Sequence, residues 1–351
     1  GLGYRTLSSC SLMPSETPFP LFLELARGSC FRARVQSSTW QRAGLTLSDR
    51  FHELLDGGTA QCLDATVARE DIEVCSRCAL LSIATLEQAI ADLGESFAMQ
   101  SIAYRKQREP QLGTLLAASV VPPSPSQSAH SQRFESAFNS ASVRLNWGSI
   151  ESEAGRFDFE ASDQSIHWCS ERGIRILGGP LLDFREELMP SWFYLIEDNF
   201  DSFVNSVTEF VRVTVERYRG SVQLWNCATG LNTPGPVPLD DEQVMRLAVA
   251  VLQTVRRADP NTPAIISFDQ PFGEYLARHR DGISALHFAD ALARSGLGMA
   301  GIGLDVRVNY QANATLPRSA MDFGHLIDRW ATLGMPMLVQ LTVPGAVSYT
   351  H

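Results

Sequence analysis

The fold of this chain is decided by the stretch Val215-Glu-Arg-Tyr-Arg-Gly-Ser-Val-Gln-Leu-Trp-Asn-Cys-Ala-Thr-Gly230. Its first residues complete an amphipathic helix expected over 199–219, Gly220 ends that helix, and 222–227 is a short apolar segment typical of a buried strand. A helix that leads through a glycine into a buried strand is the repeating unit of parallel α/β folds. Residues 226–230 form the end of this strand and the turn after it, where such folds place functional groups. They contain no carboxylate.

The same unit recurs along most of the chain. Strands are predicted at 112–121, 142–147, 174–179, 222–227, 264–268, 299–305 and 337–342. Helices are predicted at 134–138, 161–172, 199–219, 240–258, 286–295 and 321–333. This alternation predicts an α/β fold, either a TIM (β/α)₈ barrel or a doubly wound sheet. No glycine-rich phosphate-binding motif follows the first strand, which favours the barrel. No eighth unit precedes His351, so we expect a barrel truncated after strand seven.

The residues before the barrel have a different pattern. We expect an irregular segment at 1–17, a small, mostly helical module at 18–108, and the barrel at 109–351. The strongest helical periodicity lies at 71–108, and Pro110 follows it as a stop signal. Asp56-Gly-Gly58 predicts a turn. The pair Cys75-Ser-Arg-Cys78 lies within the predicted helix without a second such pair, so we expect a half-buried helical face there rather than a metal or redox site.

Composition narrows the class of protein. An apolar content of 44% and a charged content of 19% are typical of a globular protein. The net charge of -10 argues against nucleic acid as a partner, because nucleic-acid binders present a basic face. No uninterrupted apolar run reaches the roughly 18 residues of a membrane span, and no motif implies a cofactor or metal. Because residue 1 is Gly rather than Met, the sequence assigns no compartment.

Candidate functional residues follow the predicted strands. Asp183, Glu274 and Asp305 come just after the third, fifth and sixth strands and are the candidate catalytic carboxylates. The candidate substrate-binding residues are Asn146, Trp147, Trp192, Asn226 and Arg307. An aromatic face suits the apolar face of a pyranose, so the two tryptophans are candidate sugar platforms. Each has a structural alternative: the tryptophans could pack under loops, Glu274 could start a helix, and Asp305 could pair with Arg307 or Arg144.

The order of several motifs resembles that of glycoside hydrolase family 10, the xylanase-type barrels. The motifs are Phe138-Asn139, Asn146-Trp-Gly-Ser-Ile-Glu151, Gly155-Arg-Phe-Asp-Phe159, Asp163, Trp168, Gly178-Gly-Pro-Leu-Leu182, Pro190-Ser-Trp192, Arg217-Tyr-Arg-Gly220, Leu224-Trp225, Gly301-Ile-Gly-Leu304 and Leu333-Gly-Met-Pro336. They cover about residues 112–344. The resemblance implies a TIM barrel that acts on a β-linked polysaccharide such as xylan.

The same resemblance shows departures at the positions that carry the family's chemistry. Family members use two glutamates, an acid/base after strand four and a nucleophile after strand seven, and retaining hydrolysis needs them ~5–5.5 Å apart. Here these positions fall at Gly230 and Leu341. The family's histidine after strand three falls at Gly179, and its glutamine and histidine after strand six fall at Asp305 and Arg307.

Two functions stay open from the sequence. One is a glycosidase with a relocated carboxylate pair drawn from Asp183, Glu274 and Asp305, since an inverting pair tolerates a wider spacing. The other is a catalytically inactive barrel that binds carbohydrate or has a scaffold role, because a fold does not certify a chemistry. Carbohydrate is the expected partner of the glycosidase and of the carbohydrate-binding barrel. A third interpretation, an unrelated α/β protein, would require the motifs to fall in the family's order by chance.

Overall fold

The computed structural model of the chain describes residues 6–110, 113–120, 128–197, 199–279, 282–308 and 314–343. The chain divides into two compact units. The first comprises Gly1–Gly113 together with Leu316–Ile327, and the second comprises Thr114–Thr315 together with Asp328–His351.

The first unit is built on three long helices, α1 (Leu21–Arg42), α2 (Asp49–Val67) and α3 (Ile72–Arg108). The Ser48 hydroxyl caps α2 by accepting from the Phe51 N–H, and the Asp71 carboxylate caps α3 by accepting from the Glu73 and Val74 N–H groups. These caps satisfy backbone donors that have no partner within the helix. The helix predicted at 71–108 is confirmed, with basic residues in its last turn that complement the helix dipole.

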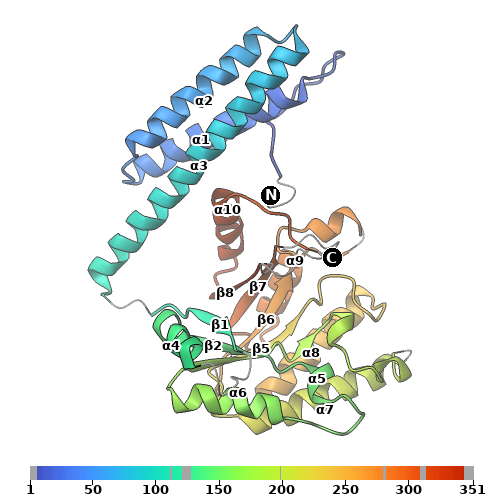
Figure 1. The fold of residues 1–351 in the computed structure, drawn as a ribbon. Coiled ribbons are helices and arrows are strands. Elements are labelled where there is room, and N and C mark those ends of the chain that lie inside the picture. The colour runs from blue at the N-terminus through green and yellow to red at the C-terminus, as the bar shows by residue number, and fades with distance from the viewer. Residues whose placement is uncertain are drawn as a thin grey trace. The chain divides into compact units, whose positions relative to one another are not determined.

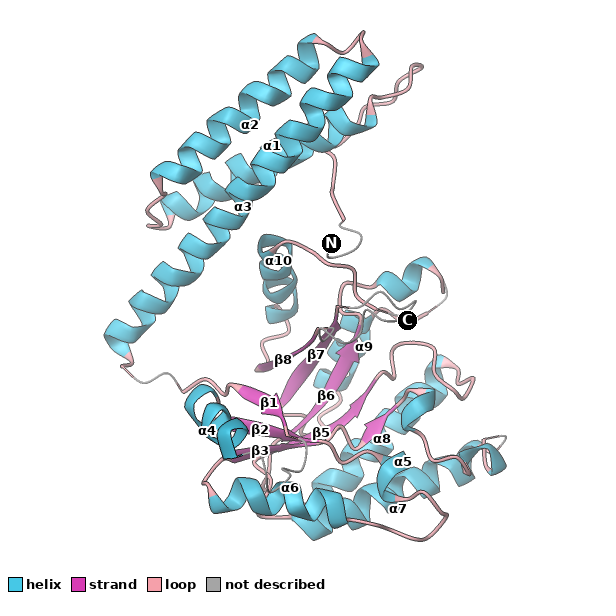
Figure 2. Ribbon diagram, viewed as in Figure 1, coloured by secondary structure: helices cyan, strands magenta, loops and turns pink. Residues whose placement is uncertain are grey.

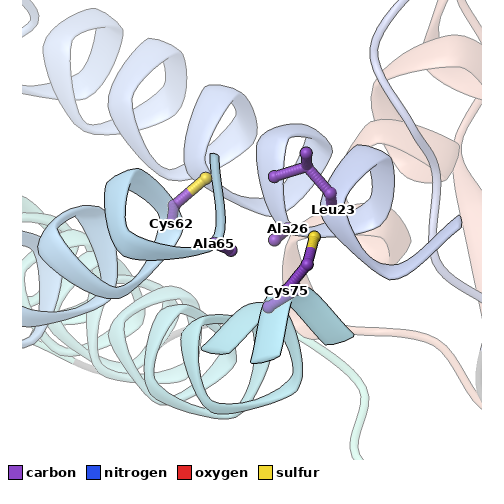
Figure 3. Close-up of a cluster of buried hydrophobic side chains, with 6 residues drawn as sticks. Leu23, Ala26, Cys62, Ala65 and Cys75 are labelled. Atoms are coloured by element: carbon purple, nitrogen blue, oxygen red, sulfur yellow. The ribbon is translucent and has the colours of Figure 1, made fainter. Parts of the chain in front are cut away.

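Small residues form a core of this bundle. Figure 3 shows Leu23 and Ala26 of α1 close to Cys62 and Ala65 of α2 and to Cys75 of α3. Burial raises the pKa of the Cys62 and Cys75 thiols, so both pack as neutral apolar groups. Cys75 is fully buried and Cys78 is partly buried, which confirms the half-buried helical face predicted for this pair.

The turn predicted at Asp56-Gly-Gly58 is wrong, because these residues lie inside α2. The reason is the approach of α3. A Cβ at Gly58 would lie 2.6 Å from Leu86 Cγ, and the Ser82 hydroxyl donates to the Gly58 carbonyl at 2.7 Å. Glycine weakens a helix locally, but here it admits a neighbouring helix. A contact between residues so far apart in the sequence leaves no local trace that separates it from a turn.

By length and composition, α3 could also cross a membrane, since it contains an 18-residue window of mean hydropathy 1.3. A search for uninterrupted apolar runs misses this window because polar residues are interspersed along it. A core helix of a bundle has the same properties, and 39% of the window is buried within the protein. The buried Ser82 and Glu87 of α3 are both hydrogen-bonded to other helices of the bundle, as buried polar groups require.

The second unit is a curled parallel sheet that matches a truncated TIM barrel (Figure 1). Its strands are β1 (Ala117–Ser119), β2 (Ser140–Val143), β3 (Arg175–Gly178), β4 (Leu182–Asp183), β5 (Leu224–Thr229), β6 (Ala264–Asp269), β7 (Gly301–Arg307) and β8 (Met337–Thr342). They run in the order β1-β2-β3-β5-β6-β7-β8, and β4 pairs with β5. Each predicted strand overlaps an observed one, although β2 ends at Val143 and Trp147, the predicted end of that strand, begins a helix. Both ends of the strand predicted at 112–121 lie outside the described residues. The sequence missed β4, which is too short to show a periodicity.

Of the helices, α6 (Glu160–Glu171), α8 (Asp241–Ala258) and α9 (Ala285–Arg294) pack against this sheet (Figure 2). The other helices that follow the bundle in the chain are α4 (Ser128–Ala137), α5 (Trp147–Ile150), α7 (Phe200–Tyr218) and α10 (Ala320–Ala331). The short 3₁₀ helices are η1 (Glu186–Leu188), η2 (Phe193–Leu195) and η3 (Glu274–Ala277). A capping box between Asp240 and Gln243 starts α8. β6 is buried along its whole length, so the barrel core lies along the central strands.

The two neighbouring glycines of α2 give a matched test of the bundle. Gly57→Ala should raise the free energy of unfolding by about 0.5–1 kcal/mol, because alanine favours a helix and the added Cβ lies 4.0 Å from Thr85 Cγ2 with no closer described neighbour. Gly58→Ala should lower it, because the Cβ overlaps the fully buried Leu86. Denaturant unfolding of both variants checks the pair. Equal effects of the two substitutions would contradict the close helix contact at Gly58.

Candidate functional site

Charged side chains gather where the central strands end. Asp183 ends β4, Asp269 ends β6, and Asp305 and Arg307 lie near the end of β7. The strands are parallel, and Asp269 pairs in register with Asp305, so these residues share the C-terminal edge of the sheet. This is the edge at which barrel enzymes carry their reacting groups. The three carboxylates are only 2–3% exposed.

Guanidinium groups compensate the buried carboxylates. Arg185, just after β4, donates from Nε to Asp183 Oδ1 at 2.5 Å and from a terminal nitrogen to Oδ2. Arg307 binds Asp269 through a terminal nitrogen, while its Nε lies 3.8 Å from Asp305 Oδ2. Bidentate and charge-assisted pairs of this kind are what make buried carboxylates tolerable. Asp305 therefore has the weakest ion pair of the three.

Asp305 has a strongly perturbed pKa. The pKa is raised from 3.8 to about 6, chiefly by burial and also by the negative charge of Asp183, against the lowering effects of Arg185, Thr229 and Arg144. Asp183 is thus near enough to Asp305 for its charge to be felt. A buried carboxyl with a raised pKa beside an ion-paired carboxylate is an arrangement common in acid–base sites, although ion-pair networks also produce it.

Several buried polar atoms at this edge have no hydrogen-bond partner among the described residues. They are Thr229 Oγ1, Asp305 Oδ1 and Arg307 Nε. Asn226 Oδ1 is also unpaired among the described residues, but Asn226 lies within β5 beside Ile265, near the start of β6. The Thr229 hydroxyl is close enough to lower the pKa of Asp305, yet the two groups do not meet hydrogen-bond geometry. An unpaired buried polar atom costs about 1–3 kcal/mol. Because the set mixes donors with acceptors, a hydroxyl-bearing ligand or water would satisfy it.

The structure treats the three candidate carboxylates differently. It brings Asp183 and Asp305 within electrostatic range of each other. Glu274 instead begins the 3₁₀ helix η3, so its structural alternative, starting a helix, is confirmed in 3₁₀ form. The pairing of Asp305 with Arg307, also foreseen as an alternative, is present at 3.8 Å.

The sugar-platform prediction is wrong for Trp147. Its side chain is 1% exposed, packs edge-on against Trp192 at 5.4 Å, and donates from Nε1 to Glu151 Oε2 at 2.7 Å. Trp192 is partly buried and donates to the Glu151 carbonyl at 2.9 Å. The Asn146 side chain accepts from the Ser149 hydroxyl at the start of α5. Trp147 and Trp192 therefore anchor the segment after β2. Spacing alone could not show this, because the same pattern fits either role.

Backbone geometry explains two departures from the family pattern. Gly230 follows β5 with φ +79°, a left-handed conformation that disfavours any side chain-bearing residue. Gly179 has φ +114°, and a Cβ there would lie 2.4 Å from the Asn226 carbonyl oxygen. The positions that the resemblance gives to a glutamate and a histidine thus have conformations suited to glycine. Leu341, at the other glutamate position, lies on β8 and is 62% exposed.

Some of the motif residues instead hold the outer helices together. Arg217 of α7 binds the Asp163 carboxylate of α6 with two N–H groups, and the Tyr218 hydroxyl donates to it at 2.9 Å. The Arg217 hydrogen bond is the main cause that lowers the pKa of Asp163. The guanidinium also lies 4.8 Å from the centre of the Phe159 ring. These motif residues therefore hold α6 and α7 together, away from the strand ends.

Arg185 was missed by sequence reasoning, and Asp269 and Thr229 were passed over although they follow predicted strands. The only local signal for Arg185 is its position two residues after Asp183, at the end of a strand too short to predict. Asp269 and Thr229 became candidates only when the register placed them next to Arg307 and Asp305.

Comparison with known proteins gives a family match for part of the chain. The sequence model of glycosyl hydrolase family 10 matches residues 103–230. A family 10 protein from Paenibacillus barcinonensis has 16% identity and a TM-score of 0.52, over 65% of this chain and 69% of that one. Xylanase 10B from Thermotoga maritima has 17% identity and a TM-score of 0.51, over 67% and 72%.

A structure described as the catalytic core of xylanase A has 13% identity and a TM-score of 0.53, over 68% of this chain and 73% of that one. At these identities the structural similarity shows a shared fold and nothing more. The evidence from sequence is the family-model match of residues 103–230. Residues 103–230 thus match the sequence model of glycosyl hydrolase family 10, and the barrel is similar in fold to xylanases of that family.

Proposed function

We propose that this chain is a glycoside hydrolase-like protein that binds a β-linked polysaccharide of the xylan type at the C-terminal edge of its sheet. The observation that carries the proposal is the set of buried, unpaired polar atoms of Thr229, Asp305 and Arg307 at the strand ends. Sugar hydroxyls both donate and accept hydrogen bonds, so they can satisfy the carboxylate, hydroxyl and guanidinium groups together. The similarity to family 10 supports this class of ligand.

At this edge, Asp305 and Asp183 are the proposed reacting pair. With a pKa of about 6, Asp305 keeps its proton in weakly acidic solution and can pass it to the glycosidic oxygen as the bond to the anomeric carbon breaks. Asp183, bound to Arg185, takes a proton from the water whose oxygen bonds to that carbon. One carboxylic acid and one carboxylate suffice for inverting hydrolysis. No metal or cofactor enters these steps.

A second function, carbohydrate binding without hydrolysis, is favoured by one specific observation. Asp183 and Asp305 are 3% and 2% exposed, so a substrate can reach both only if the strand ends open. The glycine conformation at Gly230 supports the same function, because it disfavours the family's usual acid at that position.

Hydrolysis and binding can be measured on the same variants. Reducing-sugar release from xylan, mannan and β-glucan should occur with the wild-type chain, be greatest on xylan, and fall at least ~100-fold in Asp305→Asn and Asp183→Asn. Asp290→Asn is the matched control, because this carboxylate of α9 is 39% exposed and, among the described residues, pairs with Arg294 of the same helix. Glu274→Gln tests the third candidate, and unchanged turnover would exclude it.

The outcomes separate the two functions. Binding of insoluble xylan without release by the wild type would support the non-hydrolytic barrel. Neither binding nor release on any of the three polysaccharides would overturn the proposal as a whole.

The pKa of Asp305 predicts a pH-dependent stability. Because the pKa is raised from 3.8 to about 6 in the folded chain, its contribution is fully present below pH ~4 and is lost as pH rises through ~6. Asp305→Asn removes this dependence, so its unfolding free energy relative to wild type should rise by roughly 2.4 kcal/mol between pH 4 and pH 7. Denaturant unfolding across this range checks it. Parallel curves for the two proteins would show that Asp305 has an ordinary pKa.

A further inference from the structure

The side chain of Asn232 completes the sheet of the barrel where the pairing of two strands stops. Among the described residues, β5 pairs with β6 as far as Ala228 and Ile266. Asp269, the last residue of β6, lies beyond this pairing on the β5 side, although it pairs with Asp305 of β7 on the other side. The buried backbone amide and carbonyl of such a residue need hydrogen-bond partners.

The Asn232 amide supplies both partners. Its Nδ2 donates to the Asp269 carbonyl at 2.8 Å, and its Oδ1 accepts from the Asp269 N–H at 2.9 Å. A residue of a neighbouring strand would form the same pair of bonds. Asn232 is 6% exposed and Asp269 is 2% exposed, so both bonds are shielded from solvent. Loss of the amide would leave two buried backbone groups without these partners.

The chain turns immediately after Asp269, and the turn fixes the Asp269 carboxylate. Gln270 is buried and has φ +44°, a left-handed conformation that is uncommon for residues other than glycine. Such a conformation persists only where the surrounding contacts hold it. The Gln270 N–H donates to Asp269 Oδ1 at 2.8 Å, while Asp269 Oδ2 binds Arg307. The two carboxylate oxygens of Asp269 therefore have separate partners, one in the turn and one across the site.

Asn232 also contacts the loop after β6 at a second point, Tyr275 of η3. Tyr275 is 3% exposed, and its hydroxyl donates to the Ile283 carbonyl. Burial raises the pKa of Tyr275, and a hydrogen bond with Asn232 opposes this effect. The loop is thus held by one buried amide at its start and again at η3.

Arg307 is shared unequally between two carboxylates. It binds Asp269 through a terminal nitrogen, whereas its Nε lies 3.8 Å from Asp305 Oδ2. The position of Asp269 therefore decides how much of the guanidinium is left for Asp305. We propose that Asn232 is a positioning residue of the candidate site, which fixes Asp269 and thereby keeps Arg307 at the longer distance from Asp305.

This proposal deepens the proposed function and rests on it in one respect, because Asp305 is the acid proposed there. Loss of the Asn232 amide frees Asp269 to move, so that Arg307 closes on Asp305 and stabilises its carboxylate form. The other charged groups that act on Asp305 or on Arg307 lie on other segments, and they are Asp183, Arg185, Arg144 and Glu187. The proton on Asp305 is thus controlled by a residue that acts through Asp269.

The test follows the ¹³Cγ resonance of the Asp305 carboxyl in the full-length protein labelled at aspartate, with no substrate present. The resonance is assigned by its absence in Asp305→Asn. In Asn232→Ala, Asp305 should titrate about one pH unit or more below its value in the wild type. Asn232→Ser should cause a fall in the same direction, because its shorter side chain cannot pair with both backbone groups of Asp269. It serves as the second variant where Asn232→Ala does not fold.

Thr233→Val is the matched control at the next residue. The Thr233 hydroxyl donates to the Gly230 carbonyl at 3.0 Å, within the turn after β5, and valine keeps the shape of the side chain. This variant weakens the same loop but leaves both bonds between Asn232 and Asp269 in place. Asp305 should therefore titrate in it as in the wild type.

A cycle with Asp269→Asn separates positioning from general loosening of the loop. Asp269→Asn removes the charge that holds Arg307, so Asp305 should titrate lower in this variant too. If Asn232 acts through Asp269, Asn232→Ala should cause little further fall when it is added to Asp269→Asn.

An unchanged Asp305 titration in Asn232→Ala and Asn232→Ser would overturn the proposal. An equal fall in Thr233→Val, or falls that add fully in the double variant, would also overturn it, since the effect would then come from a loosened loop. Absence of carbohydrate binding would instead overturn the proposed function and leave the titration result unaffected.

Discussion

The ion pairs of Arg307 with Asp269 and Asp305 are the constraint on which the candidate site depends. Two neighbouring strands end in carboxylates that are almost fully buried, and this arrangement is tolerable only with a guanidinium beside them. Arg185 has the same role for Asp183. Arg307 is committed mainly to Asp269, so Asp305 is left with a longer and weaker ion pair. Burial is the main cause that raises the pKa of Asp305 to about 6, and the nearby negative charge of Asp183 adds to it.

The ion-paired carboxylates lie at the C-terminal edge of the sheet. The chain is similar in fold to solved family 10 proteins, but the residues at the family's catalytic positions differ. Gly230 and Gly179 have positive φ angles that suit glycine, so a glutamate or a histidine would be strained at these positions of this chain. The pattern is kept instead where it supports the wall, as in the contacts among Asp163, Arg217 and Tyr218. The residues that maintain the fold of such a barrel differ from the residues that catalyse its reaction. A match at the fold-maintaining residues therefore says little about catalysis.

In the helical unit, too, packing between helices overrides the conformation that a residue prefers locally. Gly58 lies in a helix that its own chemistry disfavours, because Leu86 of the next helix occupies the space of its missing side chain. A residue that contradicts the local pattern there marks a contact between segments far apart in the sequence.

The sequence by itself determined the succession of strands and helices, because burial on both faces of a parallel sheet and on one face of its helices leaves strong periodicities. It also pointed to Asp183, Asp305 and Arg307, since groups that follow parallel strands must share one edge. Only the tertiary structure decided that Asp183 and Asp305 influence each other, that Trp147 is buried, and that Arg185 and Asp269 complete the cluster. Register, burial and ion pairing arise from contacts between distant segments, and a periodicity within one segment contains no record of them.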